Sequence, residues 1–212
     1  MVEVAALEQQ QNNARAMIYR WLSSLFSREI ESQSLALLQG EEGELLFRQL
    51  SFQPELRDTS LALQDRLKGI LTEEQRLHLA ADYCGLFIVA GKFCVSPYAG
   101  AYLQRLDSGE DPPLFGPMHQ HIVVNLKTMG FEVDKSFPEP ADHIGVLLAY
   151  MAELCQQGSG AQQQQFMTDY LLSWQDDFST QIERFDQGGF YVCLAKFYGL
   201  WLQLDKQWLR DG

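Results

Sequence analysis

The sequence has few cysteines, and they do not form a metal-binding or redox motif. Its four cysteines are Cys84, Cys94, Cys155 and Cys193, which lie far apart among the 212 residues. No pair has the short spacing of a Cys-x-x-Cys motif or of a zinc site. We therefore expect reduced and mostly buried thiols, and no metal site built from cysteine.

The sequence also lacks a long apolar run and an excess of positive charge. No apolar stretch reaches the ~18 residues that suggest a membrane-spanning helix, and the acidic, glutamine-rich start does not resemble a signal peptide. With 28 acidic and 16 basic residues, the net charge is −12. The electrostatic field of this negative charge repels nucleic-acid phosphates and anionic lipids and attracts cationic segments. We expect a cytoplasmic protein with no nucleic-acid partner and no membrane insertion.

The motifs of the common enzyme classes are missing as well. There is no phosphate-binding GxxxxGK[ST], no GxGxxG and no GxSxG sequence. His119 and His121 are two residues apart on an expected helix, so they point to different sides and cannot form a local metal pair. His78 and Asp82 are four apart and share a helix face, for which a solvated or structural role is the default. The sequence therefore predicts no catalytic residue, no metal and no cofactor.

An enzymatic alternative stays open at this stage. Asp142 and His143, with Ser96 or Cys94, could meet in the folded chain as a base-activated nucleophile. Adjacent residues of a helix do not face each other, so Asp142 cannot orient His143 through sequence neighbourhood alone. A helical enzyme or small-molecule-binding protein using Asp82, Asp142 and His143 is the alternative to a binding protein.

Apolar residues recur at spacings of three and four over much of the chain, which predicts amphipathic helices. The clearest stripe runs from Ala14 to Phe26, and Thr72 followed by Gln75 has the form of a capping box at a helix start. Further helices are expected around 35–38, 45–50, 61–71, 118–129, 144–155, 166–178 and 190–208. Strict alternation of apolar and polar residues is almost absent, so we predict an all-α bundle of about ten helices.

The stretch 131–140 carries two prolines and no helical stripe, so it predicts an extended connection. We place an N-terminal helical domain at 1–130, a hinge at 131–140 and a C-terminal helical domain at 141–212. Two halves joined by such a hinge can close on themselves or on a second copy. A domain-swapped homodimer is therefore our hypothesis for assembly.

Three stretches are unlike generic helix and linker. They are Asp-Tyr-Cys-Gly-Leu-Phe at 82–87, Pro-Tyr-Ala-Gly-Ala-Tyr at 97–102 and Glu-Pro-Ala-Asp-His-Ile-Gly at 139–145. In this order and spacing they resemble the TorD/DmsD family of molybdoenzyme-specific chaperones. The opening helix is also similar, so the resemblance spans nearly the whole chain. The sequences at 80–87 and at 139–143 are most similar to those of the branch that serves trimethylamine N-oxide reductase.

The resemblance implies an all-helical cytoplasmic chaperone that is not an enzyme. Members of the family bind the twin-arginine signal of a molybdenum-cofactor reductase and hold the apoenzyme until its cofactor is inserted. The implied partner here is the precursor of trimethylamine N-oxide reductase, through both its signal peptide and its core. Gly100 departs from the serine that many members carry, and so lacks that hydroxyl group.

A twin-arginine peptide presents two guanidinium groups and then an apolar stretch, so its receptor needs carboxylates beside an apolar groove. We hypothesise that three carboxylates supply the charge and that five apolar or aromatic side chains line the floor. The candidate peptide- and partner-binding residues are Asp82, Glu139 and Asp142, then Tyr83, Leu86, Phe87, Tyr98 and Tyr102, with Pro140 and His143 beside them.

Each of these residues also has a structural explanation. Tyr83, Leu86 and Phe87 lie on the apolar side of an expected helix, where core packing explains them equally well. Asp142 stands near a helix start, where a carboxylate interacts favourably with the macrodipole without any ligand. His143 could titrate near neutral pH and tune affinity, or it could be an ordinary hydrogen-bonded histidine.

Overall fold

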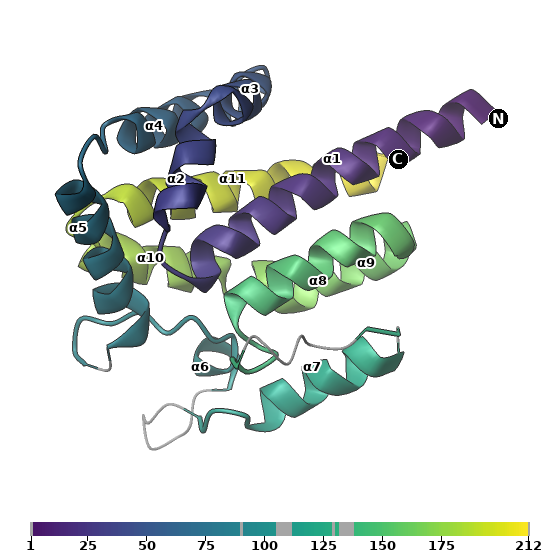
Figure 1. Ribbon diagram of the computed structural model, residues 1–212. Helices are drawn as coiled ribbons and strands as arrows, with labels where there is room; N and C mark the ends of the chain where they lie inside the picture. Colours follow the sequence, from purple (N-terminus) through teal and green to yellow (C-terminus); the bar gives the residue numbers. More distant parts are fainter. Residues whose placement is uncertain (1, 90, 105–111, 129, 132–137, 212) are drawn as a thin grey trace. The chain divides into compact units, whose positions relative to one another are not determined.

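The computed structural model describes residues 2–89, 91–104, 112–128, 130–131 and 138–211, and these form eleven α-helices, two short π-helices and no β-strand (Figure 1). The predicted all-α class is therefore confirmed. The helices are α1 (Val2–Ser27), α2 (Ser32–Gln39), α3 (Glu41–Leu50), α4 (Arg57–Lys68), α5 (Glu73–Tyr83), η1 (Cys84–Ile88), α6 (Gly100–Leu103), α7 (Pro117–Thr128), α8 (Ile144–Gln157), α9 (Gly160–Met167), η2 (Thr168–Leu172), α10 (Gln175–Phe185) and α11 (Phe190–Asp211).

The chain forms two compact units, and each unit takes segments from both sides of the expected hinge. Unit 1 consists of residues 1–27, 96–175 and 209–212, and unit 2 of residues 28–95 and 176–208. Within the hinge at 131–140, residues 132–137 lie outside the described part of the chain. The division into domains at 1–130 and 141–212 stays a prediction.

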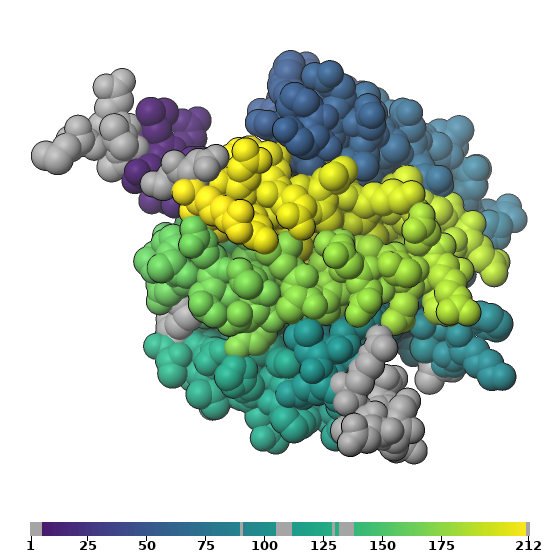
Figure 2. All heavy atoms as spheres, turned by 180° about the vertical axis from the view of Figure 1, so that it is seen from behind, coloured from purple at the N-terminus to yellow at the C-terminus, as the bar shows by residue number. Residues whose placement is uncertain are grey.

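The core of unit 1 is built on the contact between α1 and α8, which lie side by side (Figure 1). Tyr19, Leu22 and Phe26 of α1 and Leu147 and Met151 of α8 are completely buried. Burial of each such side chain contributes on the order of 1.5 to 3 kcal/mol. Figure 2 shows the other face of this unit, where the atoms of α7 (teal) lie against those of α8 and α9 (green).

The core of unit 2 is aromatic and aliphatic. Phe47, Leu63 and Leu67 from α3 and α4 are buried, as are Phe178 of α10 and Tyr191 of α11. The apolar faces of these helices therefore meet in one core, as is typical of amphipathic helices.

Two helix ends have capping geometry, and the sequence predicts the first of them. At the start of α5, the Thr72 hydroxyl accepts from the Gln75 amide at 3.2 Å and the Gln75 side chain accepts from the Thr72 amide at 3.1 Å. At the end of α7, Gly130 has φ +81° and donates to the carbonyl of Lys127, while Phe131 donates to that of Leu126. That pair of bonds is a Schellman motif, which glycine permits because it lacks a Cβ.

The prediction of one continuous helix at 166–178 is wrong. The aromatic stripe at 166–178 is divided among α9, η2, a turn at 173–174 and α10. The π-helix takes up an extra residue per turn, which leaves the side chains of Phe166, Tyr170 and Trp174 buried although the helix is interrupted.

None of the helices in the described ranges is long and apolar enough to cross a membrane.

Candidate functional site

The tyrosine-rich loop and the Glu-Pro-Ala-Asp-His segment lie side by side in unit 1. Their backbones meet in an isolated antiparallel bridge between Tyr98 and His143. The amide of Ala99 donates to the carbonyl of Asp142 at 3.0 Å, and the amide of Ile144 donates to that of Pro97 at 2.8 Å. Residues more than forty positions apart in sequence are thus held in one register.

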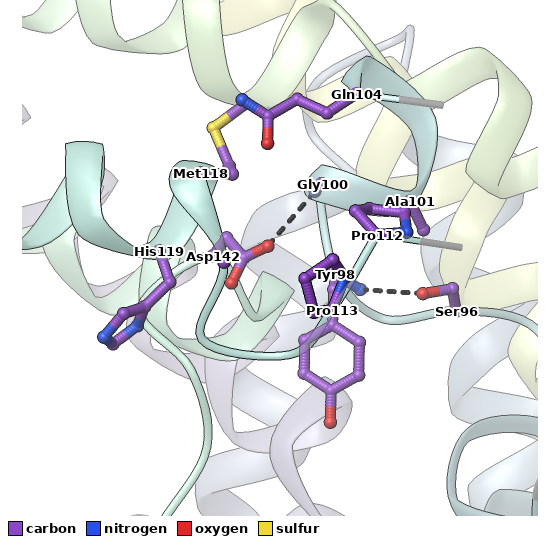
Figure 3. Close-up of a pocket in the computed structure, with 11 residues that line it drawn as sticks. Ser96, Tyr98, Gly100, Ala101, Gln104, Pro112, Pro113, Met118, His119 and Asp142 are labelled. Atoms are coloured by element: carbon purple, nitrogen blue, oxygen red, sulfur yellow. Dashed lines mark hydrogen bonds between the residues drawn. The ribbon is translucent and has the colours of Figure 1, made fainter. Parts of the chain in front are cut away.

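Asp142 uses its carboxylate to fix this loop. Its Oδ2 accepts from the Gly100 amide at 3.1 Å, at the start of α6 (Figure 3). The side chain is 7% exposed. Burial raises the pKa of the Asp142 carboxyl above its ordinary value, although the bond from Gly100 opposes the rise. The Asp142 carboxylate therefore acts at a helix start, as its structural explanation predicts, but that helix is α6 rather than α8.

His143, rather than Asp142, is the residue that caps α8. Its Nδ1 accepts from the Gly145 amide at 3.0 Å, and its ring packs edge-on against Tyr98 with centroids 5.5 Å apart. Burial lowers the pKa of His143 to about 4. A histidine with that pKa does not change its charge near neutral pH, so the structural explanation fits it and the tuning of affinity by its titration does not.

The two tyrosines of the loop are both hydrogen-bonded within unit 1. The Tyr98 hydroxyl donates to Glu139 Oε2 at 2.6 Å. The Tyr102 hydroxyl donates to the Ser96 carbonyl at 2.9 Å, and its ring stacks on Trp174 at 5.1 Å. Glu139 and Tyr98 remain partly exposed while Tyr102 is buried. Glu139 therefore supplies a carboxylate that solvent can reach.

A small hollow opens to solvent beside Asp142 (Figure 3), with a cavity volume of about 30 Å³. Tyr98, Gly100, Met118 and His119 are among the residues that line it. His119 also holds α7 to the Glu-Pro-Ala-Asp-His segment, because its Nδ1 accepts from the Ala141 amide at 2.8 Å. The hollow combines carboxylate, phenol and thioether groups, and it has room for about one water molecule.

The remaining predicted site residues belong to unit 2. Tyr83, Leu86 and Phe87 are at most 8% exposed, and the rings of Tyr83 and Phe87 pack on each other and on Tyr191. Core packing therefore accounts for these three side chains. Asp82 is half-buried on α5. A single cleft that combines these residues with those of unit 1 stays a prediction.

Sequence reasoning missed Asp186, which lies in unit 2 close to Asp82. Burial raises the pKa of the Asp82 carboxyl, the Asp186 carboxylate raises it further, and His78 acts in the opposite direction. The residues Asp186 to Gly189 lie between two helices, where the only sequence signal is a Gly-Gly pair that indicates a turn.

The described residues do not support the enzymatic alternative. Asp142 and His143 each accept a hydrogen bond from a backbone amide, and the Ser96 hydroxyl oxygen accepts from the Tyr98 amide at 3.5 Å. Asp82 and Cys94 belong to the other unit. Across the described part of the chain, no group of three or more histidine, cysteine or carboxylate side chains is placed to hold a metal ion.

Comparisons with known proteins give a consistent result. Residues 49–180 match the family described as nitrate reductase delta subunit. Chaperone protein TorD of Shewanella loihica is 43% identical over 194 residues, which cover 92% of each chain. The protein of the same name from Colwellia psychrerythraea is 35% identical, over 98% of this chain and 96% of its own. That of Vibrio vulnificus is 31% identical, over 93% and 95%. All three relatives are named as chaperones and none as an enzyme.

Proposed function

Because the chain belongs to the nitrate reductase delta subunit family and is similar to TorD chaperones over almost its whole length, we propose that it is a chaperone in the maturation of a molybdenum-cofactor reductase. It acts in the cytoplasm, where it binds the twin-arginine signal and the apo form of trimethylamine N-oxide reductase. It assists insertion of the molybdenum cofactor and holds back export until the client is mature.

The observation that carries the proposal is the identity of 31% to 43% with proteins named as chaperones, each over at least 92% of this chain. The charge of the chain is a second support. A net charge of −12 favours the encounter with a cationic leader and disfavours anionic surfaces.

The site in unit 1 supports recognition of arginine. Glu139 is partly exposed and Asp142 lines the neighbouring hollow, so two carboxylates lie beside aromatic and apolar side chains. A guanidinium group forms bidentate, charge-assisted bonds with carboxylates and stacks on aromatic rings, whereas an ammonium group is a hydrated point charge. The site therefore favours arginine over lysine.

Calorimetric titration with a synthetic twin-arginine leader peptide, and with the same peptide carrying Lys-Lys, tests this function. We expect the arginine peptide to bind roughly tenfold more tightly and its affinity to fall with rising salt. Equal heats for both peptides, or no heat for either, would contradict the proposal. A pull-down from cytoplasm should recover the reductase precursor.

Two isosteric variants locate the binding in unit 1. Glu139→Gln and Asp142→Asn remove charge but keep an acceptor for Tyr98 and Gly100, and each should weaken the arginine peptide several-fold. Glu8→Gln, an exposed carboxylate of the same unit, is the control for net charge and should bind as the unchanged protein does.

A further inference from the structure

Asp186 holds the turn between α10 and α11 and keeps one carboxylate oxygen unused. Its Oδ2 accepts from the Val192 amide at 2.8 Å, in the first turn of α11. Its Oδ1 is buried and has no hydrogen-bond partner within the described residues. A buried acceptor without a partner is unfavourable, so the free protein is destabilised at this atom.

The hydroxyl of Tyr191 is a second buried group without a partner at the same place. The side chain is 0% exposed, and its oxygen makes no hydrogen bond to any described residue. Burial raises the pKa of Tyr191 well above its ordinary value, and Tyr83, Asp186 and Asp82 raise it further. The phenol oxygen therefore lies within electrostatic range of both carboxylates.

Asp82 supplies the second carboxylate. It lies on α5, which Figure 1 shows beside the turn that joins α10 to α11. The carboxylate abuts that turn so closely that a Cβ added to Gly188 would lie 2.1 Å from Asp82 Oδ2. A glycine is needed at 188 for this approach, since any side chain would displace the carboxylate.

Arg66, a cationic side chain at the same turn, is engaged by other groups. Arg66 donates from Nη1 to the Gly188 carbonyl at 2.9 Å and from Nε to Cys193 Sγ at 3.1 Å. Among the described residues, Arg66 forms no ion pair with Asp82 or Asp186. The two carboxylates thus lie close enough to repel each other, and neither forms an ion pair among the described residues, while His78 only partly opposes the effect on Asp82.

We propose that Asp82 and Asp186, with the Tyr191 hydroxyl, bind the guanidinium group of an arginine in the client's leader peptide. The inference rests on the proposed function and assigns one arginine to a site in unit 2. A guanidinium offers five N–H donors in one plane, enough to serve the unused Asp186 oxygen, the Asp82 carboxylate and the phenol oxygen together. The ammonium group of lysine has three donors and loses more hydration.

The surface next to the carboxylates suits the apolar stretch that comes after the arginine pair of such a leader. Ile88, Val89 and Phe93, which come shortly after Asp82 in sequence, are 62%, 60% and 74% exposed. The ring of Phe93 contacts that of Phe185, the neighbour of Asp186, at 6.0 Å. A peptide with arginine followed by apolar residues can therefore place both parts within unit 2.

Three variants test the assignment in the same calorimetric titration with the twin-arginine and Lys-Lys peptides. Asp82→Asn and Asp186→Asn remove one charge each but keep the shape, and the second also keeps an acceptor for Val192. Gly188→Ala keeps both charges and forces the Asp82 carboxylate to move. We expect each to weaken the arginine peptide about tenfold and to reduce its advantage over the lysine peptide.

Matched controls are available on α5 and η1. Glu74→Gln removes an exposed charge from the helix that carries Asp82, and Gly85→Ala adds a methyl group where no atom lies within 4 Å. Both should bind the peptides as the unchanged protein does. In thermal unfolding, Asp82→Asn should be at least as stable as the unchanged protein, because it removes repulsion between like charges.

The outcomes separate the two proposals. If the unchanged protein does not distinguish the peptides, the proposed function fails. If it does distinguish them while Asp82→Asn and Gly188→Ala bind as tightly as the controls, the arginine site at Asp82 and Asp186 is overturned and the function stands. Should Asp186→Asn unfold because an amide oxygen holds the Val192 N–H less strongly than a carboxylate does, the other two variants still decide.

Discussion

His143 is an instance of a titratable residue used as a helix cap. Its Nδ1 accepts from the Gly145 amide, so the ring must be neutral at that nitrogen for α8 to be capped. The ring is 3% exposed. Protonation would place a charge in the core and remove the capping acceptor at the same time.

The pH dependence of stability can be derived from this residue. The pKa of His143 is about 4 in the folded chain, and ~6.5 is the ordinary value that applies when the chain is unfolded. Between these values the unfolded chain binds a proton that the folded chain does not. The contribution of His143 is therefore fully present above about pH 6.5, falls as the pH is lowered, and stops changing below about pH 4.

His143→Asn isolates that contribution, since asparagine caps helices and does not titrate. From about pH 7 to about pH 5, the unchanged protein should lose about 2 kcal/mol more of its free energy of unfolding than the variant. Urea unfolding at the two pH values measures the difference. Asp142, whose pKa is raised, changes the stability with pH in the opposite direction, but this contribution is the same in both proteins. Parallel pH profiles would mean that folding does not lower the pKa of His143.

At the residue scale, the sequence predicted part of the candidate site. The resemblance identified Tyr98, Glu139 and Asp142, and the structure places these residues together. It did not identify Asp186, because a carboxylate after a helix and before two glycines has the appearance of an ordinary turn. Its proximity to Asp82, about a hundred positions away, depends on tertiary packing that spacing along one helix cannot show.

At the scale of helices, the junction of α2 and α3 depends on a glycine with no unusual backbone angle. A Cβ at Gly43 would lie 1.9 Å from the carbonyl oxygen of Leu38. That oxygen belongs to the backbone, so it cannot move aside as a flexible side chain could. The two helices can therefore approach only if residue 43 has no side chain.

Gly43→Ala should lower the free energy of unfolding by about 1 to 3 kcal/mol, because the added methyl group forces the junction apart. Urea unfolding measures the loss. Gly85→Ala in the same unit is the control, where open space should let alanine raise stability by about 0.5 to 1 kcal/mol. If both substitutions stabilise the protein, the close approach at Leu38 is wrong.

Helix starts and faces could be predicted from the sequence, whereas interruptions could not. The Thr72–Gln75 capping box and the Gly130 cap are local in origin, so a few residues determine them. The stripe at 166–178 predicts one helix because aromatic residues recur every fourth position. A π-helix at Thr168–Leu172 and the turn after it preserve this recurrence. Periodicity reports which side is buried and not whether the helix is continuous.

At the scale of the whole molecule, the order of segments bears on assembly. Unit 1 combines residues 1–27 and 96–130 with residues 141–175 and 209–212, and unit 2 combines residues 28–95 with 176–208. Each unit is therefore completed by chain from beyond the expected hinge at 131–140. A second copy could supply the same segments, which is the geometry of a domain swap. The family resemblance inferred from the motifs is confirmed by the relatives, but they do not test the swap.

A cross-link within unit 1 distinguishes the monomer from the swapped dimer. A Cβ at Gly145 would lie 3.2 Å from the Cβ of Ser27, near the ~3.8 Å typical of a disulfide. In the double variant Ser27→Cys and Gly145→Cys, a swapped dimer should yield a covalent dimer on a non-reducing gel, because residues 27 and 145 then come from different chains. Light scattering coupled to size exclusion should find the same dimer before oxidation. The single variants control for the native cysteines, and a cross-linked monomer at every protein concentration would exclude the swap.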